Sequence, residues 1–196
     1  MFVQLQAESK ENYEMRTSRK SLVVMLAAVL GMVGAVRAQE TTRINMGFAS
    51  AKPTDLIDIP VTFSGSEGVQ ANSLLLHVSF PKDTLTYESV ERALAAELAD
   101  AEVKTTVADD KSDKTLGVVE VNVVGKTAIK PGIVAYVKFR VAKDAKKGEI
   151  KLGMLDSSAK GADGSPVELA KGDDGNVTLF NMDEEIPVIG CFFFTH

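Results

Sequence analysis

Most of this sequence alternates apolar and polar side chains, the period-2 pattern of strands that bury one face of a sheet. In residues 132–141, GIVAYVKFRV, the apolar Val137 and Phe139 alternate with the charged Lys138 and Arg140. The same rhythm recurs at residues 56–63, 72–80, 119–123, 150–154 and 177–180. A helix instead buries residues three and four apart, so this pattern predicts an all-β protein.

Short segments rich in Gly, Pro, Lys and Asp separate these strands, as turns require. They include Lys-Pro-Gly at 130–132, Lys-Lys-Gly at 146–148 and Asp-Asp-Gly at 173–175. Many short strands at this spacing are typical of a β-sandwich with Greek-key or jelly-roll connections. One segment differs: over residues 89–101, Val90, Leu94 and Leu98 recur at every fourth position, which predicts a short helix laid over the sandwich.

The inward side chains of the strands are expected to meet in one core between two sheets. We predict that this core includes Leu74, Leu76, Val78, Val121, Val137 and Phe139. The strand at 72–80 ends at Pro81, because proline has no N–H to donate to a neighbouring strand. Leu75 is the exception in this strand, since it shares the outward side with Ser73, His77 and Ser79.

Residues 15–38 contain the three parts of a secretory signal peptide. A basic head of two arginines and a lysine precedes an uncharged run of about 15 residues, which is short of the roughly 20 that a membrane span needs. Small residues at Val36 and Ala38 then form a cleavage site. The sequence therefore predicts an extracellular or periplasmic protein, which would contact a membrane only if this segment stayed uncleaved.

The charged residues and the single cysteine exclude several classes of function. The 22 Lys and Arg against 27 Asp and Glu give a net charge of −5, without a basic stripe interleaved with aromatics, so nucleic acid is not an expected partner. Cys191 is alone and cannot form an intramolecular disulfide. His77 has no second histidine within the strands, so we expect no catalytic site, no metal and no cofactor.

Several motifs, in order, resemble those of one known family. Residues 80–85, FPKDTL, are similar to the family's Tyr-Asp-Pro-x-x-Leu element. Residues 131–141, PGIVAYVKFRV, are similar to its Asp-Gly-x-(Ile/Leu)-Ala-x-(Ile/Leu)-x-Phe-x-Val strand. Three further matches follow: Gly148 before the next strand, the late turn Asp163–Val167, and the closing strand Gly175–Val177. Over residues 43–181 the chain resembles the cohesin domain of bacterial cellulosome scaffolds.

This resemblance implies a jelly-roll sandwich of about nine strands, with one outer sheet face that binds a dockerin, a small calcium-loaded helical module on another protein. The residues that it places on this face are Ser73, Leu75 and His77 on the third strand, Glu120 and Asn122 on the sixth, and Lys151 on the eighth. The family's best-known members carry Asn and Asp where Ser73 and Leu75 stand. The resemblance implies a secreted, non-catalytic module that docks a dockerin-like protein and is linked to extracellular polysaccharide degradation.

A carbohydrate-binding module is the alternative, because the cohesin fold is similar to that of some cellulose-binding domains. Polysaccharide binding normally uses a planar row of aromatic side chains that stack on sugar rings. Here tryptophan is absent, and Tyr87 and Tyr136 are the tyrosines that follow the signal segment. The composition therefore favours a protein partner over a polysaccharide.

The sequence thus predicts three parts: an N-terminal extension and signal peptide at 1–38, a cohesin-like β-sandwich at 43–181, and a C-terminal tail at 182–196. Either Met1 or Met15 can be the start, because the basic head of the signal segment follows Met15. The tail contains Val-Ile-Gly-Cys, which is similar to a lipidation motif but stands at the wrong end of the chain. Lipidation is therefore not expected.

Overall fold

The structure, a computed structural model, describes residues 41–65 and 68–186. The predicted signal segment and the end of the tail lie outside the described residues. The elements along the chain are β1 (Arg43–Met46), β2 (Phe48–Ala51), β3 (Leu56–Ser64), β4 (Ala71–Pro81), β5 (Leu85–Arg92), α2 (Leu94–Leu98), β6 (Glu102–Asp109), β7 (Leu116–Ile129), β8 (Gly132–Val141), β9 (Gly148–Lys160), β10 (Pro166–Val167) and β11 (Gly175–Leu179). In this part of the chain no helix is long and apolar enough to cross a bilayer.

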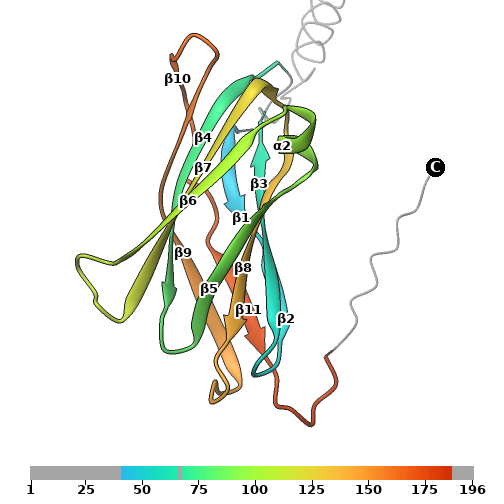
Figure 1. Cartoon of the computed structure of the whole chain (residues 1–196), viewed down its shortest axis with the longest axis vertical. Helices are drawn as coiled ribbons and strands as arrows, with labels where there is room; N and C mark the ends of the chain where they lie inside the picture. The colour runs from blue at the N-terminus through green and yellow to red at the C-terminus, as the bar shows by residue number, and fades with distance from the viewer. Residues whose placement is uncertain (1–40, 66–67, 187–196) are drawn as a thin grey trace, which may run out of the picture. The chain divides into compact units, whose positions relative to one another are not determined.

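The strands form two facing sheets, which confirms the predicted all-β sandwich (Figure 1). One sheet has the order β1-β3-β8-β5. The other has the order β2-β11-β9-β4-β7-β6, with β10 added beside β9, and makes seven strands. Most neighbours in each sheet are distant in sequence, as the predicted jelly-roll connections require. The pairs are antiparallel except for β2 and β11, which run parallel.

The described residues form eleven strands, whereas the resemblance implied about nine, and Gly47 explains part of the difference. β1 pairs with β3 in the four-stranded sheet, and β2 then pairs with β11 in the other sheet. Gly47 lies at the crossing, where its N–H donates to the Pro60 carbonyl at 2.8 Å. A Cβ at this position would lie 2.5 Å from Pro60 Cγ, so a larger residue would clash. The remaining addition is the two-residue strand β10.

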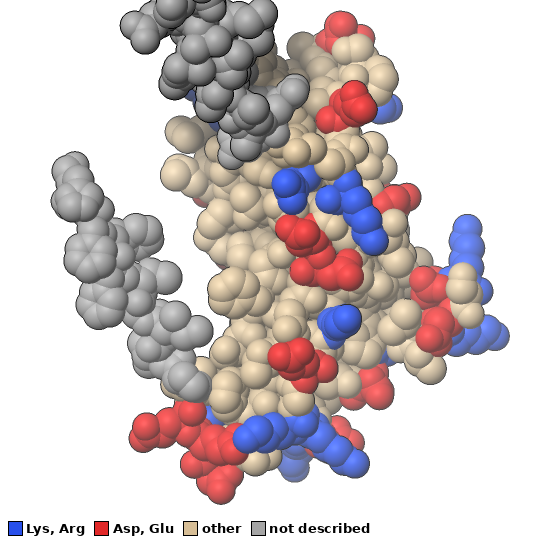
Figure 2. Space-filling model, turned by 180° about the vertical axis from the view of Figure 1, so that it is seen from behind, with Lys and Arg blue, Asp and Glu red and all other residues tan. Residues whose placement is uncertain are grey.

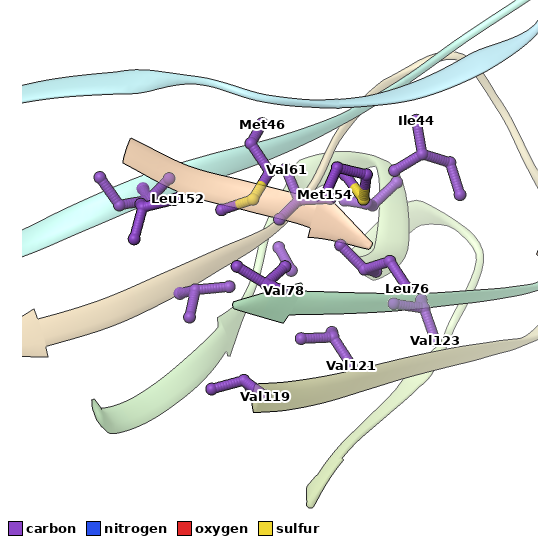
Figure 3. Packing of buried hydrophobic residues seen from close by; sticks show 14 of the residues in the cluster. Ile44, Met46, Val61, Leu76, Val78, Val119, Val121, Val123, Leu152 and Met154 are labelled. Carbon is purple, nitrogen blue, oxygen red and sulfur yellow. The ribbon is translucent and has the colours of Figure 1, made fainter. Parts of the chain in front are cut away.

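The core between the sheets is built from the side chains that the alternation predicted. The predicted core residues, Leu74, Leu76, Val78, Val121, Val137 and Phe139, are all fully buried. Figure 3 shows Ile44, Met46 and Val61 from the four-stranded sheet facing Leu76, Val78 and Val121 from the seven-stranded sheet. Because one side of β4 is committed to this core, the other side of the same strand faces outward.

The predicted helix is shorter than expected and packs on a different face. The sequence indicated a helix over residues 89–101 that buries Val90, Leu94 and Leu98. In the structure, Val90 belongs to β5, and the helix covers only Leu94–Leu98. Leu94 is 67% exposed and Leu98 is 74% exposed. The i, i+4, i+8 interpretation was therefore wrong.

Small residues decide which side of α2 faces the sandwich. Ala95 and Ala96 are the buried residues of the helix. A Cβ added to Gly132 at the start of β8 would lie 3.2 Å from Ala95 Cβ, so the helix approaches the strand closely. Alanine fits this narrow space and leucine does not, because interiors are packed without spare volume.

Candidate protein-binding face

Five of the six predicted partner-facing residues lie together on the outer side of β4 and β7. In β4, Ser73, Leu75 and His77 alternate with buried leucine and valine and are half-buried. β7 runs antiparallel beside β4, so that Leu75 lies opposite Asn122 and His77 lies opposite Glu120. We call the outer surface formed by these five residues the β4–β7 face.

The sixth residue, Lys151, lies on the same sheet but away from this group. It is exposed on β9, where it pairs with Asn176 of β11. The β9 residues beside Leu75 and His77 are instead Ser158 and Asp156. Since Lys151 is five residues before Asp156, it is displaced by roughly 16 Å along the strand. The structure therefore places Lys151 outside the β4–β7 face.

Ser79, also predicted to point outward, is buried. Gly153 of β9 lies opposite it, and the Ser79 hydroxyl donates to the Gly153 carbonyl at 3.3 Å. A Cβ at Gly153 would lie 2.6 Å from Ser79 Oγ. The hydroxyl thus occupies the space that a side chain on β9 would otherwise fill, and it offers little to a partner.

His77 bridges two carboxylates on the neighbouring strands. Its Nε2 lies 3.1 Å from Glu120 Oε2 on β7, and its Nδ1 is hydrogen-bonded to the Asp156 carboxylate on β9. A protonated imidazole donates from both nitrogens, which suits two acceptor-only partners. With both nitrogens engaged, His77 forms a bridge between strands and does not resemble a general base held beside a nucleophile.

The two acids alter the protonation of His77. The side chain is only 28% exposed, and this partial burial lowers its pKa. The hydrogen bonds and charges of Asp156 and Glu120 outweigh that effect and raise the pKa of His77 above its ordinary value of 6.5. The bridge therefore keeps its proton to a higher pH than an unperturbed histidine would.

This shift predicts a pH-dependent contribution to stability. The folded pKa is above the unfolded one, so the contribution is complete below about pH 6.5 and is lost as the pH rises through the folded pKa. We expect the free energy of unfolding to fall by up to about 1 kcal/mol over that rise, since both acids are partly exposed to solvent. His77→Gln should lack this decline. Urea denaturation of both proteins across the range measures it, and declines of equal size would show that His77 is not the cause.

Sequence reasoning did not find Asp156, although the sequence contains a signal for it. Leu152 and Met154 are buried, but the next inward residue is Ser157, so the alternation changes phase after Met154. The register shows why: His77 pairs with Asp156 and Val78 with Met154, which leaves Leu155 unpaired as a β-bulge. The bulge turns Leu155 and Asp156 outward in succession.

A hollow of about 450 Å³ lies at the His77 end of the β4–β7 face. Its polar wall contains His77, Glu120 and Asp156, and its apolar part contains Val118 and Leu155. The rest of the lining comes from the end of β6 and the loop that follows it, residues 106 and 108–112. We call this depression the His77 hollow.

The other half of the face is centred on Leu75. This leucine lies between Asn122 on β7 and Ser158 on β9, with Ser73 and His77 before and after it on its own outward side. The Asn122 Oδ1 atom is buried and has no hydrogen-bond partner among the described residues. An apolar centre surrounded by polar groups is the anatomy of a protein interface.

In residues 41–65 and 68–186, no group of three or more His, Cys, Asp or Glu side chains is arranged to hold a metal ion. Cys191 lies outside the described residues.

Among known proteins, solved structures have a similar fold, whereas sequence comparisons find no relative. No protein-family model matches the sequence, and no curated protein matches it. A structure described as a non-cellulosomal cohesin from the hyperthermophilic archaeon Archaeoglobus fulgidus is 21% identical, with a TM-score of 0.58, over 73% of this chain and 94% of that chain.

Two bacterial structures are similar to the same extent. The OlpA cohesin of Clostridium thermocellum, solved in a type I complex with a dockerin, is 16% identical with a TM-score of 0.60, over 71% of this chain and 99% of that chain. The CaCohA2 protein of Clostridium acetobutylicum is 17% identical with a TM-score of 0.57, over 72% of this chain and 92% of that chain. The sandwich described here therefore has the fold of a cohesin domain.

Proposed function

We propose that this chain is a non-catalytic module of the cohesin type that binds a dockerin-like protein through the β4–β7 face. The observation that carries this proposal is Leu75, an apolar residue on the outer side of β4 that lies directly between the polar Asn122 on β7 and Ser158 on β9. The proteins of similar fold include cohesins solved in complex with dockerins. This likeness is what makes a dockerin-like module the preferred partner.

The sheet is large enough for such a partner. The six adjacent strands from β2 to β6 contain 55 residues. A strand residue covers roughly 16 Å² of a sheet face, so this face measures roughly 870 Å². That is close to the roughly 800 Å² per partner that an interface of standard size buries, about 1,600 Å² in total. The seven-stranded sheet can therefore support a specific complex without help from another part of the chain.

The chemistry of the face indicates how this partner differs from that of the best-known cohesins. Ser73 and Leu75 stand where the resemblance places Asn and Asp. Leucine replaces a charged hydrogen-bonding side chain, so the partner is expected to present an apolar side chain at that point. Specificity then depends on the polar groups around Leu75.

Charge gives no support to a polyanionic partner. On the face that Figure 2 shows, Lys and Arg side chains alternate with Asp and Glu side chains, and the band of basic side chains at the lower end lies beside a group of acidic ones. Nucleic acids and anionic lipid surfaces select a continuous basic surface. A protein surface with its own mixed charges is a better match.

The aromatic residues count against the polysaccharide alternative. Tyr136 is on β8 of the four-stranded sheet, and exposed Phe48 is on β2 of the other sheet. Tyr87 packs edge-on against Phe139, and its hydroxyl is hydrogen-bonded to Thr105. In the described part of the chain these rings are too far dispersed to form a planar row for sugar stacking.

Export and a link to polysaccharide degradation are part of the same proposal. They rest on the signal-like segment, with cleavage after Ala38, and on the scaffold role that the resemblance implies. The module would then meet its partner outside the cell.

Affinity capture tests the proposed partner. The immobilised chain is expected to retain, from the proteins that its host secretes, a protein with a calcium-binding helical module, identified by mass spectrometry. A chelator should release that protein, because calcium is required by the partner's fold. The chelator should not change the melting temperature of the chain itself, whose described residues contain no metal-ligand group.

Two results would contradict the proposal. Capture that is equally strong in the chelator would exclude a calcium-loaded module. Retention of the chain on insoluble polysaccharide, without capture of any protein, would instead support the carbohydrate-binding alternative.

A further inference from the structure

The His77 hollow contains two carboxylates that share one compensating group. Asp156 on β9 and Glu120 on β7 approach His77 on β4 from opposite sides. Their side chains are 71% and 41% exposed, so a second positive group can still reach them. Among the described residues neither acid forms another ion pair.

The other charged groups around the hollow cancel in number. Asp109 at the end of β6 is paired with Lys82, which follows β4, at 2.6 Å. Asp110 accepts backbone hydrogen bonds within its own loop. The next residue, Lys111, also lines the hollow and has the opposite charge. The net charge of the hollow is therefore set by Asp156, Glu120 and the protonation of His77.

The apolar part of the hollow adjoins these acids. Leu155, turned outward by the bulge, is 53% exposed, and Val118 of β7 is half-buried beside Ala108 of β6. An arginine side chain has matching parts, because its aliphatic stem covers apolar surface while its charged end stays accessible. Its planar guanidinium has five N–H donors and can satisfy two carboxylates at once.

We propose that the His77 hollow binds an arginine side chain of the partner, with the stem against Leu155 and Val118 and the guanidinium over the His77 ring, against the exposed sides of the Asp156 and Glu120 carboxylates. This inference rests on the proposed function, since it assigns one residue of the partner that docks on the β4–β7 face. It commits to a cationic side chain and not to a free ion, because an ion would leave the apolar part of the hollow uncovered.

His77 makes this contact dependent on pH. When His77 is protonated, its own charge compensates one of the two acids and competes with the arginine. When it loses the proton, both acids lose the only ion-pair partner that they have among the described residues. The pKa of His77 is raised by those same acids, so the change occurs above pH 6.5. Arginine binding is therefore weaker in mildly acidic solution and stronger in mildly alkaline solution.

A short peptide tests the hollow without the natural partner. The probe is acetyl-Leu-Arg-Leu-amide, and its control is the same peptide with citrulline, which has the shape of arginine but no charge. Binding is followed by NMR through the methyl groups of Leu155 and Val118 in the full chain. The arginine peptide should bind at least about threefold more tightly at about pH 9 than at about pH 6, the size expected for a partly exposed ion pair. The citrulline peptide should show no such change.

Three variants separate the contributions of His77, Asp156 and Glu120 to binding of the arginine peptide. His77→Gln cannot be protonated, so it should bind the arginine peptide equally well at both pH values. Asp156→Asn and Glu120→Gln should each weaken binding at about pH 9 by about threefold. Equal binding of both peptides, or tighter binding at about pH 6, would overturn the proposal.

The outcomes also distinguish this inference from the proposed function. If the arginine peptide binds as expected but no calcium-dependent protein is captured, the hollow is confirmed and the dockerin-like partner is wrong. If a dockerin-like protein is captured with an affinity that neither pH nor His77→Gln changes, the dockerin-like partner is confirmed and the arginine contact is wrong.

Discussion

Phe139→Ala is expected to lower the free energy of unfolding by about 3–5 kcal/mol, a large share of the 5–15 kcal/mol typical of a domain. Phe139 is fully buried on β8, and its ring lies 5.1 Å from that of Phe80 and 6.2 Å from that of Tyr87 between centroids. Alanine would remove both aromatic contacts and leave a cavity between the sheets. In a domain of this size the melting temperature should fall by roughly 10 °C or more.

Lys138→Ala on the same strand is the matched control. Lys138 points outward and forms ion pairs with Asp58 at 3.5 Å and Glu91 at 2.8 Å, whose side chains are largely exposed. Loss of such pairs costs about 1 kcal/mol or less. Thermal and urea denaturation of both variants compare the two faces directly. Similar losses from the two substitutions would mean that the inward and outward sides of β8 are wrongly assigned.

Leu75→Asp is expected to weaken binding of the captured partner by about 2 kcal/mol or more, roughly thirtyfold in affinity. Leu75 is the central apolar residue of the β4–β7 face, where a partner would remove it from water. Aspartate at this point would be desolvated on binding, and no basic side chain of the described face lies opposite it on β7 or β9. Because the position faces outward, the fold should tolerate the change.

Leu56→Asp is the matched control for this prediction. Leu56 is also an exposed leucine, but it lies on β3 of the four-stranded sheet, opposite Arg140. Its replacement should leave partner binding unchanged, as measured by isothermal titration with variants of similar melting temperature. Equal affinities of Leu75→Asp and the wild-type chain would exclude the β4–β7 face as the binding site.

The two sets of experiments separate folding from recognition. Phe139 and Leu75 are both large apolar residues on strands, but one lies between the sheets and the other on the outer surface. The first should control the stability of the domain with no direct effect on a partner. The second should control affinity with little effect on stability.

Local patterns were sufficient to predict the longer strands β3, β4, β7 and β8 and most of their buried sides, although they did not indicate β6. Side chains alternate along a strand with a period of two, so each apolar residue on the inward side identifies its neighbours two positions away. This is why the fully buried Leu74, Leu76 and Val78 could be predicted without knowledge of their partners. It is also why Leu75 and His77 could be placed on the outward side.

Local patterns do not determine which distant strands pair or in which register. His77 and Asp156 are 79 residues apart, and only the antiparallel register of β4 with β9, shifted by the bulge at Leu155, brings them into contact. The same register leaves Lys151 outside the binding face. The buried side of α2 was likewise decided by the close approach of Gly132 to Ala95.

The sequence by itself thus determined the sandwich, its core and the outward position of most of the candidate residues, because burial along a strand follows from local periodicity. The tertiary structure alone decided that His77 lies between Glu120 and Asp156 beside a hollow. Strand order and register are set by the packing of the whole core, and a one-residue bulge is enough to change which side chains meet.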